Sequence, residues 1–350
     1  MRLLDDPEAI SRIDSGNMLG AINHFPDLMT DAARIHPVLS FGRSTPFQSV
    51  VLMGMGGSAS AGDVLLDWLA DRIPVPAFVV RDSSIPKFVD KRTLFIAFSY
   101  SGNTAETLEA FRLARIRGST LIGIGSGGTL AKICRQHSVP FLRVVPGLVP
   151  RAALSQMVAL GAMVLEGFGL VRNIRRDLSD AGKELEITRS QLRVEVPFLT
   201  NRAKSVAAML KGSVPVIYCL QRMSSVARRF KNQLAENSKI VAKYELLPEA
   251  GHNEVEAWIV QRAGLVPLMV RDWLESSREK VLFEAFRSTV KRASKVEPLE
   301  VRMRATTELG RLLAPILFVD YTSAYLAFLR GVDPTTTPWI REYRKKIQAS

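Results

Sequence analysis

Cysteine and clustered histidine are scarce in this sequence of 350 residues, and each scarcity argues against a class of protein. Two cysteines, Cys134 and Cys219, are too few for a disulfide framework, and they form no CxxC pair. The four histidines are scattered along the chain, so no metal site is expected. Zinc-finger spacing, an RNP motif and a helix-turn-helix are also missing, so nucleic acid is not an expected partner.

Signal-like and membrane-spanning segments are lacking as well. The N-terminal stretch MRLLDDPEAI has no apolar core of signal-peptide length, so we expect a cytoplasmic protein. The apolar segment from Leu312 to Leu329 is about as long as a short membrane span. Because it contains Pro315 and Asp320 and has an arginine at each flank, we expect a buried helix and no membrane partner.

Acidic residues are fewer than basic ones, 34 against 47, which gives a net charge of +13. Such a balance favours anionic partners, among them phosphorylated small molecules. The basic residues are spread along the chain in short clusters, so a solvated basic surface accounts for most of them. A chain of this length is long enough for two domains, each with its own core.

The most informative stretch covers residues 48–62, QSVVLMGMGGSASAG. An apolar run typical of a buried parallel strand stops at a glycine turn, and a helical pattern follows over 59–70. This arrangement directs backbone N–H groups and the positive end of a helix dipole at one point, which suits a phosphate. The turn matches neither GxxxxGK[ST] nor GxGxxG, and by itself a tight turn without a ligand accounts for it equally well.

Strands and helices alternate from residue 48 onward, which predicts an α/β fold with doubly wound parallel sheets. We expect domains at 46–170 and 211–350, joined by a helical connection at 171–210 and preceded by a helical segment at 1–45. The first domain has expected strands at 48–53, 77–81, 93–98, 119–124 and 139–145, and helices at 59–70, 104–117, 128–136 and 151–168. The second has expected strands at 214–220, 239–247, 266–272 and 299–303, and helices at 224–236, 275–292 and 312–329.

A second hydroxyl-rich turn, FSYSGNT, follows the third expected strand. Ligands of such sheets bind at the carboxyl ends of the strands, so Ser99, Ser101 and Thr104 are expected beside the first turn. Asn103 is the expected N-cap of the next helix, paired with Glu106. Two such turns at equivalent positions favour a phosphate pocket, which a third turn at 125–129 would border. No glycine-rich phosphate turn recurs in the second half.

Several motifs together make the sequence resemble a known family. GMGGSASAGD, FSYSGNTAETL and PRAAL resemble the sugar isomerase (SIS) superfamily. KNQLAENSK, LPEAGHNEVE, GVDPTTTP and the opening IDSGNMLGAINHFPD resemble its bifunctional phosphoglucose/phosphomannose isomerases. The resemblance implies two tandem SIS-type domains and reversible conversion of glucose 6-phosphate or mannose 6-phosphate to fructose 6-phosphate. It also implies a phosphorylated hexose substrate, a homodimer with a histidine contributed across the interface, and neither metal nor organic cofactor.

The same resemblance assigns roles to individual residues. Glu236 matches the base that moves a proton between adjacent carbons, and His252 matches the acid that opens the sugar ring. Arg151 matches the arginine that stabilises an enediolate, and Thr337 matches a threonine associated with accepting both C2 epimers. The phosphate cradle corresponds to Gly56, Gly57, Ser58, Ser99, Ser101 and Thr104. In the expected helix 224–236, Arg229, Gln233 and Glu236 share one face.

One departure concerns the C-terminal segment, where relatives place an active-site lysine. By spacing from Thr337, that position here is Arg344, and Lys345 comes next. Arginine and lysine differ in reach and in proton transfer, so either Arg344 substitutes or a shift of register brings in Lys345. Two other functions stay open: a SIS-type sensor that binds a sugar phosphate without turnover, and isomerisation of another phosphosugar.

Overall fold

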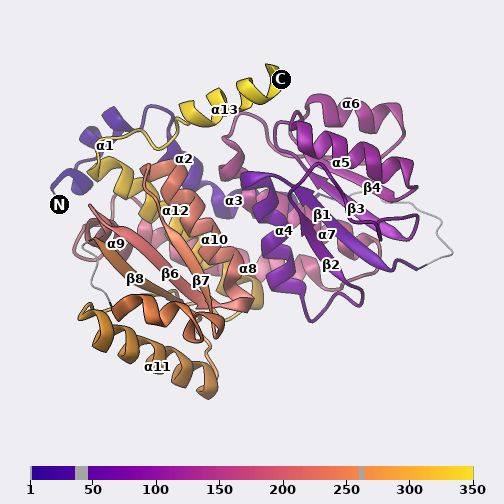
Figure 1. Ribbon diagram of the computed structural model, residues 1–350. Helices are drawn as coiled ribbons and strands as arrows, with labels where there is room; N and C mark the ends of the chain where they lie inside the picture. The colour runs from indigo at the N-terminus through magenta and orange to yellow at the C-terminus, as the bar shows by residue number, and fades with distance from the viewer. Residues whose placement is uncertain (1, 36–45, 260–263, 350) are drawn as a thin grey trace. The chain divides into compact units, whose positions relative to one another are not determined.

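The computed structural model describes residues 2–35, 46–259 and 264–349 (Figure 1). Part of the expected segment 1–45 therefore lies outside the described residues. The chain forms two compact units, one comprising 1–23, 187–305 and 314–350, the other 24–186 and 306–313. This grouping differs from the expected boundaries, because the first 23 residues belong with the second half of the chain and not to a separate segment.

The unit at 24–186 is built on a five-stranded parallel sheet with the order β2-β1-β3-β4-β5. Every residue of β1 and β3 is buried, as continuous apolar runs predict for strands covered on both faces. The strands are β1 Ser49–Gly54, β2 Ala77–Val80, β3 Thr93–Phe98, β4 Thr120–Gly125 and β5 Phe141–Arg143. The sheet matches the predicted order of elements, although β5 is shorter than the expected 139–145.

Alternate residues of these strands pack on different helices. Val51, Phe95 and Ala97 form one buried cluster with α5 (Ala105–Ile116) and α6 (Gly128–Gln136). On the other face, α4 (Gly56–Leu69) and α7 (Leu154–Gly167) both lie close to the sheet: a Cβ at Gly62 of α4 would lie 3.1 Å from Leu52 Cβ, and one at Gly161 of α7 would lie 2.9 Å from Phe98 Cζ. The sheet is therefore covered on both sides, as in a doubly wound α/β unit (Figure 1).

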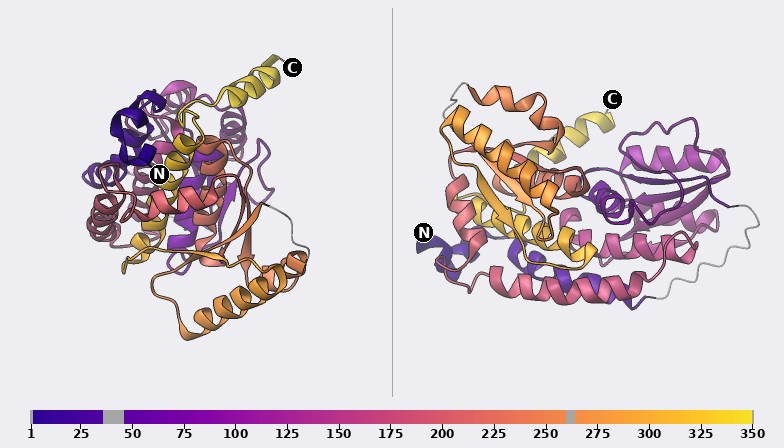
Figure 2. Two further views of the ribbon diagram at one scale, coloured as in Figure 1. Left: turned by 90° about the vertical axis from the view of Figure 1, so that its left-hand side faces the viewer. Right: turned by 90° about the horizontal axis from the view of Figure 1, so that it is seen from below.

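The other unit contains a four-stranded parallel sheet with the order β7-β6-β8-β9. Tyr218 and Met269 pack on Phe283, Phe286 and Val290 of α11 (Ser277–Ser294), which lies along one face of this sheet (Figures 1 and 2). The strands are β6 Val214–Leu220, β7 Lys243–Leu247, β8 Leu265–Arg271 and β9 Leu299–Arg302. The two parallel sheets confirm the predicted tandem α/β fold.

Two expected elements on either side of Glu236 have bounds that differ from the prediction. The helix predicted at 224–236 stops at Gln233 as α10 (Ser224–Gln233), and a single π-helical turn covers Leu234–Ser238. The strand predicted at 239–247 begins only at Lys243, because Lys239 adopts a left-handed backbone with φ 58°.

The expected apolar helix is α12 (Glu308–Leu329), which meets the length and composition of a membrane span. Its most apolar window of 18 residues is 94% buried inside the protein, as in the core helix of a globular unit. The remaining α-helices are α1 Pro7–Ile13, α2 Met18–Asn23, α3 Phe25–Ala33, α8 Ile174–Leu192, α9 Arg202–Leu210 and α13 Pro338–Ala349. Short 3-10 helices cover Arg2–Asp5, Pro150–Ala153, Gln221–Met223, Glu249–Gly251 and Glu254–Ile259.

Candidate active site

The first of the predicted phosphate turns joins β1 to α4. Gly56 opens α4 with φ +52°, a backbone conformation that favours glycine, and open space surrounds its Cα on the side where a Cβ would point. No side chain caps this helix start, which leaves its first N–H groups for a ligand. Ser58 is buried, and its Oγ accepts a hydrogen bond of 3.2 Å from the backbone N–H of Tyr100. That bond ties the first turn to the second.

Each hydroxyl group of the second turn takes part in a hydrogen bond within that turn. Ser99 Oγ donates to Thr104 Oγ1 at 3.2 Å, and Ser101 Oγ accepts from the Asn103 N–H at 3.3 Å. Ser99 is buried, Thr104 is half-buried and Ser101 is exposed. Thus the hydroxyl groups predicted from the sequence do gather at the start of α5.

The predicted cap of α5 is wrong. Thr104 occupies the N-cap position, and the side chain of Asn103 reaches the third turn instead. There Asn103 Oδ1 accepts hydrogen bonds from the N–H and the hydroxyl of Thr129, both at 2.9 Å. The third turn is therefore hydrogen-bonded to the second through Asn103 and Thr129.

Arg151 lies against the first turn, in the 3-10 helix Pro150–Ala153. A Cβ at Gly57 would lie 3.1 Å from Arg151 Cα and 3.2 Å from its backbone nitrogen, so only glycine allows this approach without displacement. The loop before Arg151 is fixed by Tyr100, whose hydroxyl accepts from the Leu148 N–H at 2.7 Å and donates to Val145 O at 3.0 Å. The structure thus brings Arg151 and both predicted turns together, although they are far apart in the sequence.

Glu236 and Thr337 are linked within the other unit. Glu236 is half-buried in the π turn, and its carbonyl oxygen accepts a hydrogen bond from Lys239 Nζ. The same ammonium donates to Thr336 O at 2.7 Å, directly before Thr337. One lysine therefore connects the turn of the predicted base to the segment that carries Thr337.

The other three predicted site residues are exposed. His252 follows the short helix Glu249–Gly251 and is held there by its backbone N–H, which donates to Glu249 O at 2.9 Å. Arg344 and Lys345 both lie on α13 with exposed side chains.

Two protein-family models match the chain: "SIS domain" over residues 47–138 and "Bacterial phospho-glucose isomerase C-terminal SIS domain" over residues 199–347. A bifunctional phosphoglucose/phosphomannose isomerase of Caldicellulosiruptor bescii is 31% identical over 336 residues, which are 94% of this chain and 98% of the relative. The chain belongs to the bifunctional phosphoglucose/phosphomannose isomerase family.

More distant similarities agree with the fold of this isomerase family. A D-glucosamine-6-phosphate 4-epimerase of Sulfolobus acidocaldarius is 30% identical over 225 residues, 64% of this chain and 68% of the relative. The crystal structure of a hypothetical protein from Thermus thermophilus superimposes with a TM-score of 0.72 at 14% identity, covering 98% of this chain and 96% of the other. At that identity the second similarity shows the fold alone.

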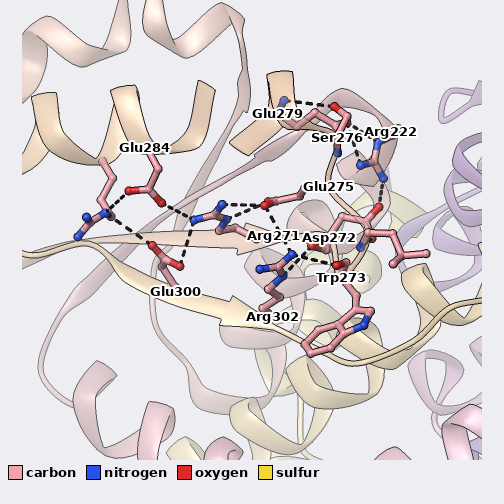
Figure 3. Close-up of polar contacts among 12 residues, drawn as sticks. Arg222, Arg271, Asp272, Trp273, Glu275, Ser276, Glu279, Glu284, Glu300 and Arg302 are labelled. Atoms are coloured by element: carbon pink, nitrogen blue, oxygen red, sulfur yellow. Dashed lines mark hydrogen bonds and ion pairs between the residues drawn. The ribbon is translucent and has the colours of Figure 1, made fainter. Parts of the chain in front are cut away.

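In this isomerase family member, the second sheet has ion pairs where the first has its predicted phosphate turns. Arg222 follows β6 and pairs with Asp272, which follows β8, while Arg222 Nε also donates to Glu279 at 3.0 Å (Figure 3). Beside them, Arg271 donates to both carboxylate oxygens of Glu275, at 2.9 and 2.7 Å. The guanidinium groups at this edge are thus bound to carboxylates and are not left to attract an anion, which agrees with the expectation that the second domain has no phosphate site of its own.

The sequence reasoning missed a contact between the two ends of the chain. Ser15 Oγ donates to Asp333 Oδ2 at 2.5 Å, so the IDSGN segment lies against the segment before Thr337. Next to it, Asp14 accepts from the N–H groups of Met18 and Leu19 at 2.7 and 2.9 Å. Burial raises the pKa of Asp14 above its usual range. The sequence signal for this contact was that both segments, IDSGN and GVDPTTTP, resemble the same family.

Proposed function

We propose that this protein interconverts glucose 6-phosphate or mannose 6-phosphate with fructose 6-phosphate. The observation that carries the proposal is the packing of Gly57 on Arg151, beside the hydroxyl groups of the second turn. Arg151 is a buried residue whose backbone lies against the start of α4, and an arginine there suits a substrate with a phosphate and a developing negative charge. The family relationship supplies the reaction class.

The proposed reaction needs each residue in a definite role. The phosphate binds at the backbone N–H groups of Gly56 and Gly57 and at the hydroxyl groups of Ser58, Ser99, Ser101 and Thr104. His252 donates a proton to the ring oxygen, which opens the sugar. Glu236 then takes the proton from C2 and returns it to C1, and Arg151 stabilises the enediolate between the two transfers.

Further parts of the proposal concern the assembly. We propose a cytoplasmic homodimer in which His252 of one subunit serves the site of the other, with no metal, nucleic acid or membrane involved. Thr337 sets which C2 epimers are accepted, and Arg344 or Lys345 completes the site from α13. The net charge of +13 supports a preference for an anionic substrate.

An assay of both hexose phosphates tests the proposal. We expect the purified protein to form fructose 6-phosphate from each substrate, equally well with and without a chelator. Glu236→Gln should abolish turnover while both substrates still raise the melting temperature, and Glu8→Gln, an exposed change in α1, should leave turnover intact. Substrate binding without turnover in the unmodified protein would favour a SIS-type sensor instead.

A second substrate class has one specific observation in its favour. The relative from Sulfolobus acidocaldarius, whose name gives it a glucosamine 6-phosphate substrate, aligns with 64% of this chain. Glucosamine 6-phosphate therefore belongs in the same assay. If the protein converts glucosamine 6-phosphate with a higher kcat/KM than glucose 6-phosphate, the proposed substrate becomes an amino-sugar phosphate and no longer glucose 6-phosphate or mannose 6-phosphate.

A further inference from the structure

The turn that carries Glu236 has an unusual backbone. After α10 the chain makes one π-helical turn over Leu234–Ser238, a rare conformation that often marks functional sites. Glu236 is half-buried there, while the next two residues, Asn237 and Ser238, are fully buried. A side chain at such a turn keeps a fixed direction only if its neighbours hold the turn in place.

The helix before the turn is held by a buried carboxylate of α12. Asp320 Oδ1 accepts from Arg229 Nε at 2.8 Å and from Gln233 Nε2 at 2.7 Å, and Asp320 Oδ2 accepts from Arg229 Nη2 at 2.5 Å. Arg229 and Asp320 are each only 2% exposed. Arg229 and Gln233, which the sequence predicts on one face of the helix, thus both bind α12.

The turn itself is held one helical turn further along α12. Ser323 Oγ accepts from Asn237 Nδ2 at 2.9 Å, and the carbonyl oxygen of Ser323 accepts from Ser238 Oγ at 2.7 Å. Ser323 Oγ in turn donates to the carbonyl oxygen of Asp320 at 2.9 Å. Both the helix and the π turn are thus bonded to one short stretch of α12.

We propose that Asp320 and Ser323 are positioning residues for Glu236, which rests on the proposed function. A buried ion pair is seldom more stabilising than apolar residues of the same volume, so its presence in an otherwise apolar helix needs another reason. A general base must lie within hydrogen-bond reach of the proton that it removes. The bonds from α12 supply that placement, since they fix the residues on both sides of Glu236.

Three variants test this role. Ser238→Ala removes one bond to α12 without leaving a buried charge, and Asp320→Asn weakens the bonds to Arg229 and Gln233. Thr322→Val is the matched control, because Thr322 is a fully buried residue of the same helix whose hydroxyl donates to Phe318 O at 2.8 Å, within α12 itself. If Asp320→Asn does not fold, Ser238→Ala alone tests whether bonds to α12 position Glu236.

We expect kcat to fall about tenfold in Ser238→Ala and further in Asp320→Asn, as a misplacement of less than 1 Å implies, with KM little changed. Glucose 6-phosphate deuterated at C2 should show a larger isotope effect on kcat in these variants than in the wild type, since proton removal becomes slower. Thr322→Val should match the wild type in both. A merely structural role would lower the amount of folded protein without changing the isotope effect.

The outcomes separate this inference from the proposed function. If Glu236→Gln is inactive while Ser238→Ala and Asp320→Asn keep wild-type kcat and isotope effect, the positioning role alone is overturned. If Glu236→Gln is fully active, the assignment of the base fails and the positioning role fails with it. Loss of kcat with a raised isotope effect in Ser238→Ala and Asp320→Asn, against an unchanged Thr322→Val, supports the inference.

Discussion

Replacing Gly57 with alanine tests whether the contact between the first turn and Arg151 matters for function. The new Cβ would lie 3.1 Å from Arg151 Cα, whereas ordinary contacts between carbon atoms are about 3.5–4.0 Å. The nearest atoms that this Cβ would meet belong to the backbone of Arg151, so no side-chain rotation relieves the contact. Arg151 must therefore retreat by roughly half an ångström.

The expected effect on activity exceeds the expected effect on stability. Since a misplacement of 1 Å can cost about 100-fold in rate, half that distance predicts a loss of roughly tenfold in kcat/KM. Overpacking costs about 1–3 kcal/mol, and replacing a helical glycine returns about 0.5–1 kcal/mol. The variant should therefore stay folded, and its loss of kcat/KM with glucose 6-phosphate should be measured beside a urea unfolding curve.

Gly182→Ala provides the matched control. Gly182 is also a helical glycine of the same unit, but its nearest neighbour is the Thr30 hydroxyl at 3.3 Å, a side-chain atom that can move aside. We expect unchanged kcat/KM and a gain in stability of about 0.5–1 kcal/mol. Wild-type kcat/KM in the Gly57 variant would refute the idea that Arg151 has to lie this close to the turn.

Three further predictions concern stability and reactivity. Arg271→Met leaves Glu275 buried without its main partner and should lower the free energy of unfolding by about 3 kcal/mol. Urea denaturation measures this loss, and an unchanged unfolding midpoint would contradict the prediction. Burial raises the pKa of the Cys134 thiol to about 12, so Ellman's reagent should label Cys134 at pH 8 only after unfolding. Rapid labelling of Cys134 in the native protein would show that this thiol is not buried. Because the folded state raises the pKa of Asp14, it holds that proton more tightly than the unfolded state, and the resulting stability is lost as pH rises past 3.8 and through the raised pKa. Asp14→Asn should therefore reduce the fall in unfolding free energy across that range, and an identical pH profile would contradict the assignment.

The parts of the fold that sequence predicts best are those where one physical pattern acts alone. β1 and β3 are continuous apolar runs, and their strands fall within one residue of the predicted bounds. The end of α10 was not predictable, because its helical pattern continues through Glu236 and only bonds to α12 turn the backbone into a π turn. Long-range hydrogen bonds of this kind leave no periodic signal in the chain.

The candidate site likewise has parts that the sequence predicts and parts that it does not. The glycine and serine turns were predicted from strand order, and Tyr100 and Gly57 show how they are joined. Asp320 appears in the sequence only as a charge that argues against a membrane span. Its role depends on Arg229, which is 91 residues away, so it required the structure.

The two hydrogen bonds of Lys239 bear on how this enzyme could be redesigned. Because one ammonium joins the carbonyl oxygens of Glu236 and Thr336, a change in the segment of Thr337 also alters the support of the proposed base. Substitutions made there to select one epimer should then act non-additively with substitutions at Lys239. Epimer preference and catalytic rate would have to be optimised together in such a library, with Lys239 varied alongside Thr337.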